Sequence, residues 1–234
     1  MNVTVRDVAK LADVSTKTVS RVVNNQGEIS EATRARVQAA IQQLGYRPNV
    51  LARSLVNRRS NTLAVVTWGI DYYAPSRIVV GIEQKAVELG YSLFLNLMAD
   101  PRDENSEQVL NKLLTHQVDG IVWAVPQVNG NRAWLETFRM EHLPPIVFLT
   151  MEARPGLPTL SIDNHLGGFQ ATQHLILQGC RRIGLISGRQ DWWEARERRA
   201  GWQQALLQAG LSDEPALVVE TDWSVDGARL PCKR

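Results

Sequence analysis

Strand-like and helix-like segments alternate from residue 62 to residue 220, and this alternation limits the possible folds more than any other feature of the chain. Short apolar runs typical of buried strands occur at 62–67, 92–97, 120–125, 145–150, 159–163, 182–187 and 216–220. Segments with helical patterns lie between them, at about 76–89, 104–117, 131–141, 165–178 and 194–209. Repeated strand–helix units predict a doubly wound parallel sheet with covering helices.

Aromatic residues gather directly after these predicted strands. In doubly wound sheets, ligands bind outside the carboxyl ends of the strands, so these positions are candidates for a binding site. A sugar ring has apolar faces and hydroxyl edges, which suit stacked aromatic rings with a few polar groups. For any one tryptophan, the alternative is an ordinary core position. The residues concerned are Trp68, Tyr72, Tyr73, Trp123, Trp192, Trp193 and Trp223.

The first 45 residues predict three helices with clear boundary signals. Thr4 followed by Asp7 forms a capping box for a helix at 5–12, and Ser15 caps a second helix after a short turn. Ser30 and Gly45 bound a third helix at 31–44. Two short helices joined by a tight turn and followed by a third describe a helix-turn-helix unit.

The segment VSTKTVSRVV, residues 14–23, has two contrasting faces at helical spacing. One face carries Val19, Val22 and Val23, and the other carries Thr16, Lys17, Ser20, Arg21 and Asn24. Lys and Arg can contact guanine in the major groove, and Thr can donate or accept a hydrogen bond there. We therefore expect the valines to fix this helix in the head while the polar face contacts DNA. A solvated surface helix is the alternative.

Charge is distributed unevenly along the chain. Residues 1–60 contain ten Lys and Arg against four Asp and Glu, whereas residues 61–234 contain sixteen against twenty. A basic head on an acidic body points to a polyanionic partner for the head, with an ordinary basic surface as the alternative. The two cysteines show no paired spacing, and no apolar run suits a signal peptide or a membrane span. We expect a cytoplasmic protein with no membrane partner, metal or cofactor.

The sequence VTVRDVAKLADVSTKTVSRVVN resembles the DNA-binding head of the LacI/GalR family of bacterial transcription regulators. EISEATRARVQAAIQQLGYRPNVLARSL continues the resemblance to residue 55. The family motif is matched at Asp7, Val8, Ala9, Val14, Ser15, Thr18, Val19, Ser20, Arg21 and Val22. With the polar face described above, the resemblance implies DNA-binding residues at Thr4, Ser15, Thr16, Lys17, Thr18, Ser20, Arg21 and Asn24.

Residues 46–60, YRPNVLARSLVNRRS, are compatible with a helix that is too short to be stable alone. The resemblance implies a hinge helix that forms only on DNA, paired with its dimer mate in the minor groove. Leu55 would then be an apolar wedge between base pairs, with Ala52 beside it. Arg58 and Arg59 would contact phosphate. A plain linker is the alternative.

The rest of the chain is similar to the periplasmic-binding-protein-like effector core of the same family, in which a small ligand lies between two α/β subdomains. The resemblance implies a helix-turn-helix domain at 1–46, a hinge at 47–60, an N-subdomain at 61–160 and a C-subdomain at 161–234. It places effector-binding residues at Tyr72, Ala74, Pro75, Ile78, Ala124, Thr150, Trp192, Arg196 and Trp223. Ala124 and Thr150 stand where the family's namesake has an amide and a carboxylate, so the effector need not be a galactoside.

The family pattern extends beyond the last residues of this sequence, because the strands cross between the two subdomains more than once. ARLPCKR, at the end of the chain, does not match the expected continuation. We therefore expect both doubly wound subdomains in the intact fold, the second incomplete here through a truncation or a reading-frame change near residue 227.

Together these observations predict a transcriptional repressor. A homodimer binds near-palindromic double-stranded operator DNA, and a small sugar-like effector between the subdomains changes operator affinity. An enzyme is disfavoured, because the sequence has no phosphate loop or G-x-G-x-x-G and its four histidines lack metal-ligand spacing. A sugar-binding module would leave the basic head unexplained. A defective repressor fragment that binds DNA weakly is the remaining alternative.

Overall fold

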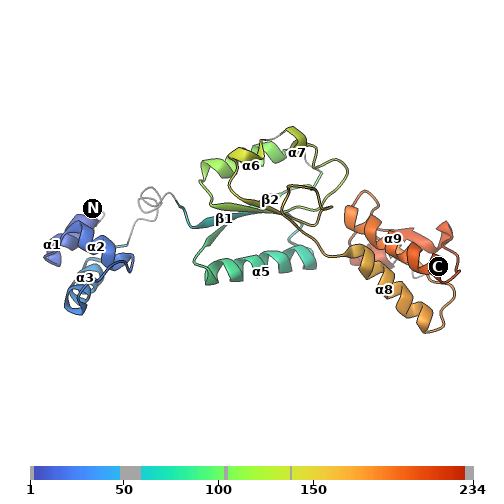
Figure 1. Ribbon diagram of the computed structural model, residues 1–234, viewed down its shortest axis with the longest axis horizontal. Coiled ribbons are helices and arrows are strands. Elements are labelled where there is room, and N and C mark those ends of the chain that lie inside the picture. The colour runs from blue at the N-terminus through green and yellow to red at the C-terminus, as the bar shows by residue number, and fades with distance from the viewer. Residues whose placement is uncertain (1–2, 48–58, 103–104, 138, 230–234) are drawn as a thin grey trace. The chain divides into compact units, whose positions relative to one another are not determined.

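The computed structural model describes residues 3–47, 59–102, 105–137 and 139–229. The chain forms two compact units, Met1–Ser60 and Asn61–Arg234, which are treated separately below (Figure 1). The hinge positions Ala52 and Leu55 lie outside the described residues. Within the described ranges, no helix combines the length and apolar character needed to cross a bilayer.

The described residues of the first unit form three helices, as the sequence predicts: α1 (Val5–Leu11), α2 (Thr16–Val23) and α3 (Glu31–Leu44) (Figure 1). Each contributes a fully buried valine to one small core, in the order Val8, Val19 and Val37. A tight turn joins the first two helices, and the Val14 N–H donates to the Ala9 carbonyl at 3.0 Å. The small, buried Ala9 lies where the first helix ends against the second.

Side-chain caps fix the ends of these helices. The backbone N–H and the hydroxyl of Thr4 donate to the Asp7 carboxylate at 2.8 and 2.7 Å. The Ser15 hydroxyl accepts from the Thr18 N–H at 3.1 Å, which satisfies one otherwise unpaired donor of α2. Gly45 ends α3 at φ +61°, in the left-handed region that favours glycine.

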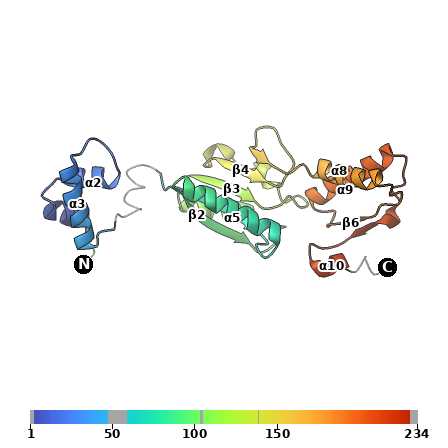
Figure 2. The same cartoon turned by 90° about the horizontal axis from the view of Figure 1, so that it is seen from below.

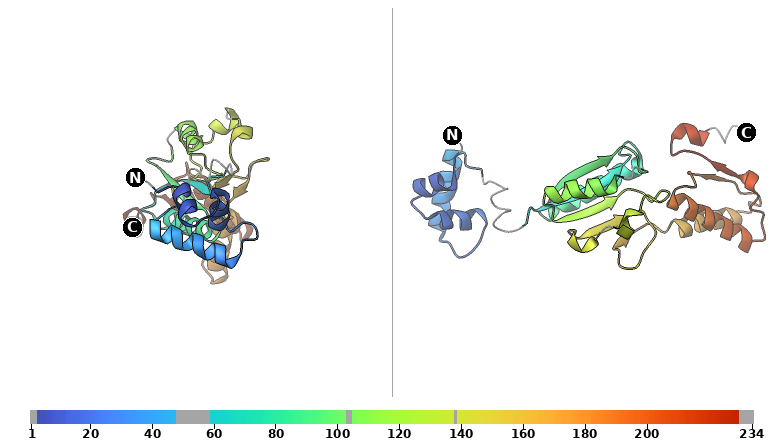
Figure 3. Two further views of the ribbon diagram at one scale, coloured as in Figure 1. Left: turned by 90° about the vertical axis from the view of Figure 1, so that its left-hand side faces the viewer. Right: turned by 90° about the horizontal axis from the view of Figure 1, so that it is seen from above.

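A five-stranded parallel sheet begins the second unit, with strand order β2-β1-β3-β4-β5. Its strands are β1 (Thr62–Trp68), β2 (Ser92–Met98), β3 (Gly120–Ala124), β4 (Ile146–Leu149) and β5 (Thr159–Leu160). Helix α5 (Tyr73–Glu88) covers one face and α6 (Ser106–Thr115) the other (Figure 1). Figure 2 shows the sheet from the α5 side, and the right-hand view of Figure 3 shows it from the opposite side. This part, residues 61–163, is called the sheet lobe below.

The C-terminal lobe, residues 164–229, contains a two-stranded parallel sheet and two long helices (Figure 2). Its elements are α8 (Asn164–Leu177), β6 (Leu185–Ser187), α9 (Trp193–Gln208), η2 (Pro215–Leu217), β7 (Val218–Glu220) and α10 (Val225–Arg229). The two helices touch backbone to backbone, since a Cβ on Gly201 would lie 2.0 Å from the His165 carbonyl oxygen. Trp202 of α9 is buried, and its indole nitrogen donates to the Ile183 carbonyl at 3.2 Å.

The prediction of one continuous helix over residues 131–141 is wrong. Among the described residues of this region, the structure has only the four-residue α7 (Trp134–Thr137) and the 3-10 turn η1 (Met140–His142). Positive φ angles at Asn129 and Gly130 turn the chain just before it.

Asn131 holds that turn in place. Its side-chain oxygen accepts from the Val128 N–H at 3.1 Å, and its amide nitrogen donates to the Pro101 and Pro126 carbonyls at 2.7 and 2.9 Å. The bond to Pro101 joins segments thirty residues apart in sequence, so no local pattern could reveal it.

Several other predicted boundaries also need correction. The strand predicted at 159–163 ends at Leu160, because the Ser161 hydroxyl bonds the Met151 backbone in place of a ladder hydrogen bond. The strands predicted at 182–187 and 216–220 are shorter than expected, and the sequence did not predict α10. Helix α5 begins three residues earlier than predicted, with Pro75 in the first turn, where proline is tolerated.

Candidate functional site

The polar face of α2 is held outward by its buried opposite side. Val19 and Val22 are buried in the head core, whereas Thr16, Lys17, Ser20 and Arg21 are exposed. These four residues are called the α2 outer face below. It presents two cations and two hydroxyl groups on one short, well-capped helix, which suits contact with phosphates and base edges.

Other predicted DNA-binding residues already have structural roles. Thr4 bonds Asp7, and Ser15 and Thr18 form the N-cap of α2. Asn24 is half-buried at the end of α2, and its amide donates to the Ser20 hydroxyl at 3.3 Å. These residues fix the helix that carries the outer face.

In the second unit, four aromatic side chains form a continuous row between the two lobes. Tyr72 and Trp68 from the sheet lobe stack at 5.3 Å between ring centroids, and Trp68 lies 5.3 Å from Trp192 of the C-terminal lobe. Trp192 meets Trp223 edge-on at 5.4 Å. The row therefore draws its rings from both lobes and spans the junction between them.

Two loops pair their backbones where the lobes meet. The Trp193 N–H donates to the Gln127 carbonyl at 3.0 Å, and the Asn129 N–H donates to the Asp191 carbonyl at 3.1 Å. Val128 and Trp192 form the antiparallel bridge between these bonds. The loop after β3 is therefore joined to the loop that leads into α9.

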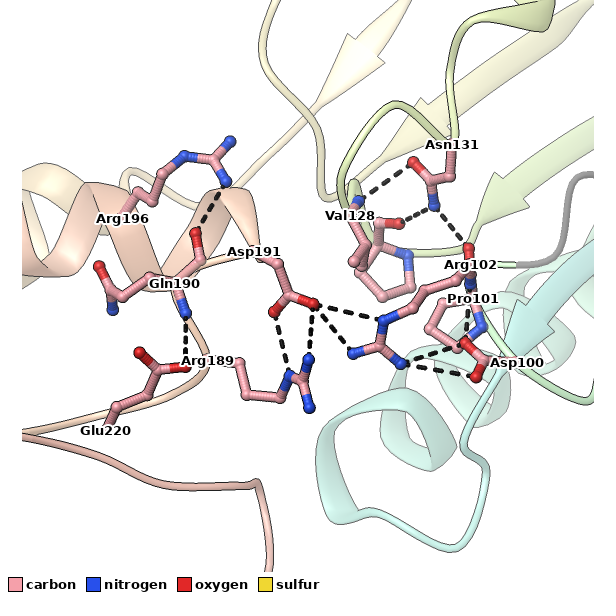
Figure 4. Close-up of polar contacts among 11 residues, drawn as sticks. Asp100, Pro101, Arg102, Val128, Asn131, Arg189, Gln190, Asp191, Arg196 and Glu220 are labelled. Atoms are coloured by element: carbon pink, nitrogen blue, oxygen red, sulfur yellow. Dashed lines mark hydrogen bonds and ion pairs between the residues drawn. The ribbon is translucent and has the colours of Figure 1, made fainter.

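A charged cluster reinforces this junction (Figure 4). One carboxylate oxygen of Asp191 accepts from Arg102 of the sheet lobe at 3.0 and 3.3 Å, and from Arg189 at 3.1 Å. Burial raises the pKa of Asp191, but the hydrogen bonds from Arg189 and Arg102 outweigh it, so that the pKa lies below its ordinary value. Asp191 is therefore ionised at neutral pH and links the lobes electrostatically.

Two oppositely charged residues lie at the same junction, Arg132, which is buried, and Glu194, which is half-buried. Arg132 is only 2% exposed, and one of its terminal nitrogens donates to the Val125 carbonyl. Burial lowers the pKa of Arg132 to about 10. Burial raises the pKa of Glu194, in the first turn of α9, to about 7, although Arg198, Arg132 and Arg196 oppose that shift.

The structure brings only some of the predicted effector residues together. Tyr72, Trp192 and Trp223 belong to the aromatic row, and the Thr150 carbonyl accepts from the Gln127 N–H of the junction. Ala124 is buried at the end of β3. Three further positions, Ala74, Pro75 and Ile78, lie in the first two turns of α5.

Arg196 differs most from the expectation. It is exposed, and its guanidinium donates to the Gln190 carbonyl at 3.1 Å (Figure 4). Arg198, two residues later, instead lies over the Trp223 ring at 5.2 Å and donates to the Asn164 side chain. Among the aromatic residues that follow predicted strands, Trp123 is not part of the aromatic row: it is a core residue that packs against Trp134.

Sequence reasoning missed Arg132, Glu194 and Arg198. Arg132 lay within a predicted helix, and charged residues on a helix are ordinarily solvated. Its neighbour Gly130 was the one available signal of a turn there.

Two family models match the chain. Residues 4–49 match "Bacterial regulatory proteins, lacI family", and residues 72–230 match "Periplasmic binding proteins and sugar binding domain of LacI family".

Whole proteins and solved structures give the same result. The catabolite control protein A of Priestia megaterium is 32% identical over 227 residues, covering 97% of this chain and 68% of that protein. The ribose operon repressor of Escherichia coli (strain K12) is 36% identical over 228 residues, covering 96% and 67%. A lac repressor dimer crystallised with operator and the anti-inducer ONPF matches with a TM-score of 0.85 at 30% identity, covering 99% of this chain and 69% of that one.

The helix-turn-helix head, the parallel α/β core and these matches agree, and the chain belongs to the LacI family of bacterial regulatory proteins.

Proposed function

We propose that the chain is a DNA-binding transcriptional repressor whose operator affinity is controlled by a small sugar-like effector. Its place of action is the cytoplasm, and its role is regulation rather than catalysis. The observation that carries the proposal is the aromatic row, which draws Trp68 from one lobe and Trp192 and Trp223 from the other. A ligand beside the row contacts both lobes, so binding it favours one lobe arrangement over another.

The head supplies the contact with DNA. The α2 outer face enters the major groove, where Lys17 and Arg21 contact phosphate or guanine and Thr16 and Ser20 contact base edges. A dimer places two such faces on a near-palindromic operator. Segment 47–60, with Ala52 and Leu55 at the minor groove, transmits the change in lobe arrangement. Coupling of this kind is typically about 1–3 kcal/mol, or roughly 5–150-fold in affinity.

The test of DNA binding is fluorescence anisotropy against duplexes selected from a near-palindromic pool, over a salt series. We expect a selected duplex to bind far more tightly than random DNA. A plot of the logarithm of the binding constant against the logarithm of the salt concentration should have a slope of about −0.9 for each phosphate that the protein neutralises. Lys17→Ala and Arg21→Ala should each weaken binding, whereas Arg36→Ala, on the exposed side of α3, is the matched control. Equal affinity for selected and random duplexes would refute this part.

The effector is tested on the same complex. A panel of sugars and sugar derivatives is added to the protein with its selected duplex, and at least one should change operator affinity. Trp223→Ala should abolish that change but leave operator binding unaltered. An operator affinity that no member of the panel alters would refute the effector part alone.

A further inference from the structure

At the junction between the lobes, five side chains carry buried polar atoms that have no hydrogen-bond partner among the residues that the structure describes. They come from the loops after β3, β4 and β7, and from the start of α9. Buried polar groups are rarely left unpaired, so each such atom requires an explanation. The atoms are Nε and Nη1 of Arg132, Oγ1 of Thr150, Nε1 of Trp192, Oε2 of Glu194 and Nε1 of Trp223. We call these residues the junction polar set.

Ring contacts, hydrogen bonds and an electrostatic interaction connect the members of this set. Trp192 and Trp223 are in ring contact at 5.4 Å, and Glu194 follows Trp192 by two residues. Thr150 is joined to the same place because Gln127 donates to its carbonyl and accepts from the Trp193 N–H. Arg132 lies in the loop that contains Gln127 and interacts electrostatically with Glu194.

The set offers many more donors than acceptors. The indole nitrogens and the guanidinium can only donate, so the Thr150 hydroxyl, which can do either, and the Glu194 carboxyl are the two possible acceptors. Burial also raises the pKa of Glu194 to about 7, which disfavours its ionised form. A ligand that satisfies these donors must itself be rich in acceptor oxygens.

The excess of positive charge at the junction also favours a ligand with acceptor oxygens, and in particular an anionic one. Three arginines are the charges acting most strongly on Glu194, and Arg154 is a further cation acting on Arg132. A guanidinium that is 2% exposed without a full set of acceptors costs free energy that an anion would recover. A neutral sugar can accept these hydrogen bonds but leaves the positive charge unbalanced.

We propose that the effector is an acidic sugar derivative, whose phosphate or carboxylate accepts from Arg132 while its ring lies against Trp192 and Trp223. This inference rests on the proposed sugar effector and narrows its class. Arg132 then determines the preference for an acidic ligand over its neutral parent.

The test is a titration followed by intrinsic tryptophan fluorescence, since Trp192 and Trp223 report on the site directly. Neutral hexoses and pentoses are compared with their phosphates and with the corresponding sugar carboxylates, at constant ionic strength, with inorganic phosphate alone as a further probe. We expect at least one sugar phosphate or sugar carboxylate to bind ten-fold or more tightly than its neutral parent. Comparing the sugar phosphates with the sugar carboxylates shows which of the two anionic groups the site prefers.

Three variants connect the preference to one side chain. Arg132→Gln should reduce the preference to within about two-fold, and Arg132→Lys should keep part of it because the charge remains. Arg181→Gln, at an exposed position, should leave it unchanged. If Arg132→Gln does not fold, the wild-type preference and the Lys variant decide.

Neutral sugars that bind as tightly as their acidic derivatives, or a preference that persists in Arg132→Gln, would overturn the inference. If a neutral sugar does so and also alters operator affinity, the proposed function stands and only the acidic class fails. If no sugar of either kind binds, both fail.

Discussion

Replacing Glu194 by Gln should make the core more stable at high pH, because burial in the lobe junction penalises the charged carboxylate. Burial is the largest cause of the raised pKa, and it outweighs the opposing effect of Arg198, Arg132 and Arg196. Glutamine keeps nearly the same shape and cannot ionise. The substitution therefore isolates the cost of burying the charge.

The magnitude follows from the size of the pKa shift. A rise in the pKa of Glu194 from 4.5 to about 7 corresponds to a difference of about 3 kcal/mol in how strongly the folded protein favours the protonated over the ionised carboxyl. Between these pH values the folded state binds more protons than the unfolded state, so the carboxyl makes stability fall as pH rises, and the loss levels off above pH 7. The stability advantage of Glu194→Gln over wild type should therefore grow by about 2–3 kcal/mol between pH 5 and pH 8.

Urea unfolding followed by tryptophan fluorescence measures this difference. All seven tryptophans lie in residues 61–234, so the signal reports on the core and not on the head. Glu83→Gln, at an exposed position on α5, is the matched control and should follow the wild type at both pH values. Parallel stability curves for wild type and Glu194→Gln would show that the junction does not penalise this charge, and would refute the reasoning.

Three further predictions concern stability. Gly201→Ala should destabilise the C-terminal lobe by about 1–3 kcal/mol in the same urea assay, because its Cβ would overlap the His165 carbonyl; unchanged stability would contradict the close helix contact. Ser15→Ala should cost the head about 1 kcal/mol, seen as faster amide exchange in α2, and equal exchange rates would exclude the cap. Asp191→Asn should lower core stability by about 1 kcal/mol at pH 7, through the lost bonds from Arg102. Because the pKa of Asp191 is lowered in the folded protein, its carboxylate stabilises the fold when it is ionised, and this contribution is lost as the pH falls and the carboxylate is protonated. The stability deficit of Asp191→Asn should therefore vanish in acid, and a deficit that persists there would contradict the ion pair.

Sequence periodicity predicted most of the fold correctly. The three head helices, the caps at Ser15 and Gly45 and the positions of β1 to β4 follow from patterns that span fewer than twenty residues. Such patterns determine which side of a segment is buried, because each apolar side chain must leave water whatever it packs against. The outward polar face of α2 could be predicted for this reason.

The candidate effector site was only partly predictable. Strand-end aromatics were recognisable as a group, but the sequence gave no means of separating Trp68, in the row between the lobes, from Trp123, in the core. Nor could the sequence separate Arg196, which is exposed, from Arg198, which lies over the Trp223 ring. Neighbours along a chain have similar local patterns, whatever they contact in three dimensions.

The sequence by itself determined the order of helices and strands, the burial of their apolar faces and the family to which the chain is similar. Only the tertiary structure decided which polar groups meet at the lobe junction. Arg132 and Glu194 are sixty-two positions apart, and their electrostatic interaction depends on how β3, α9 and the intervening chain pack. The charge and pKa of such groups depend on that distant packing, because burial removes the water that would otherwise screen them.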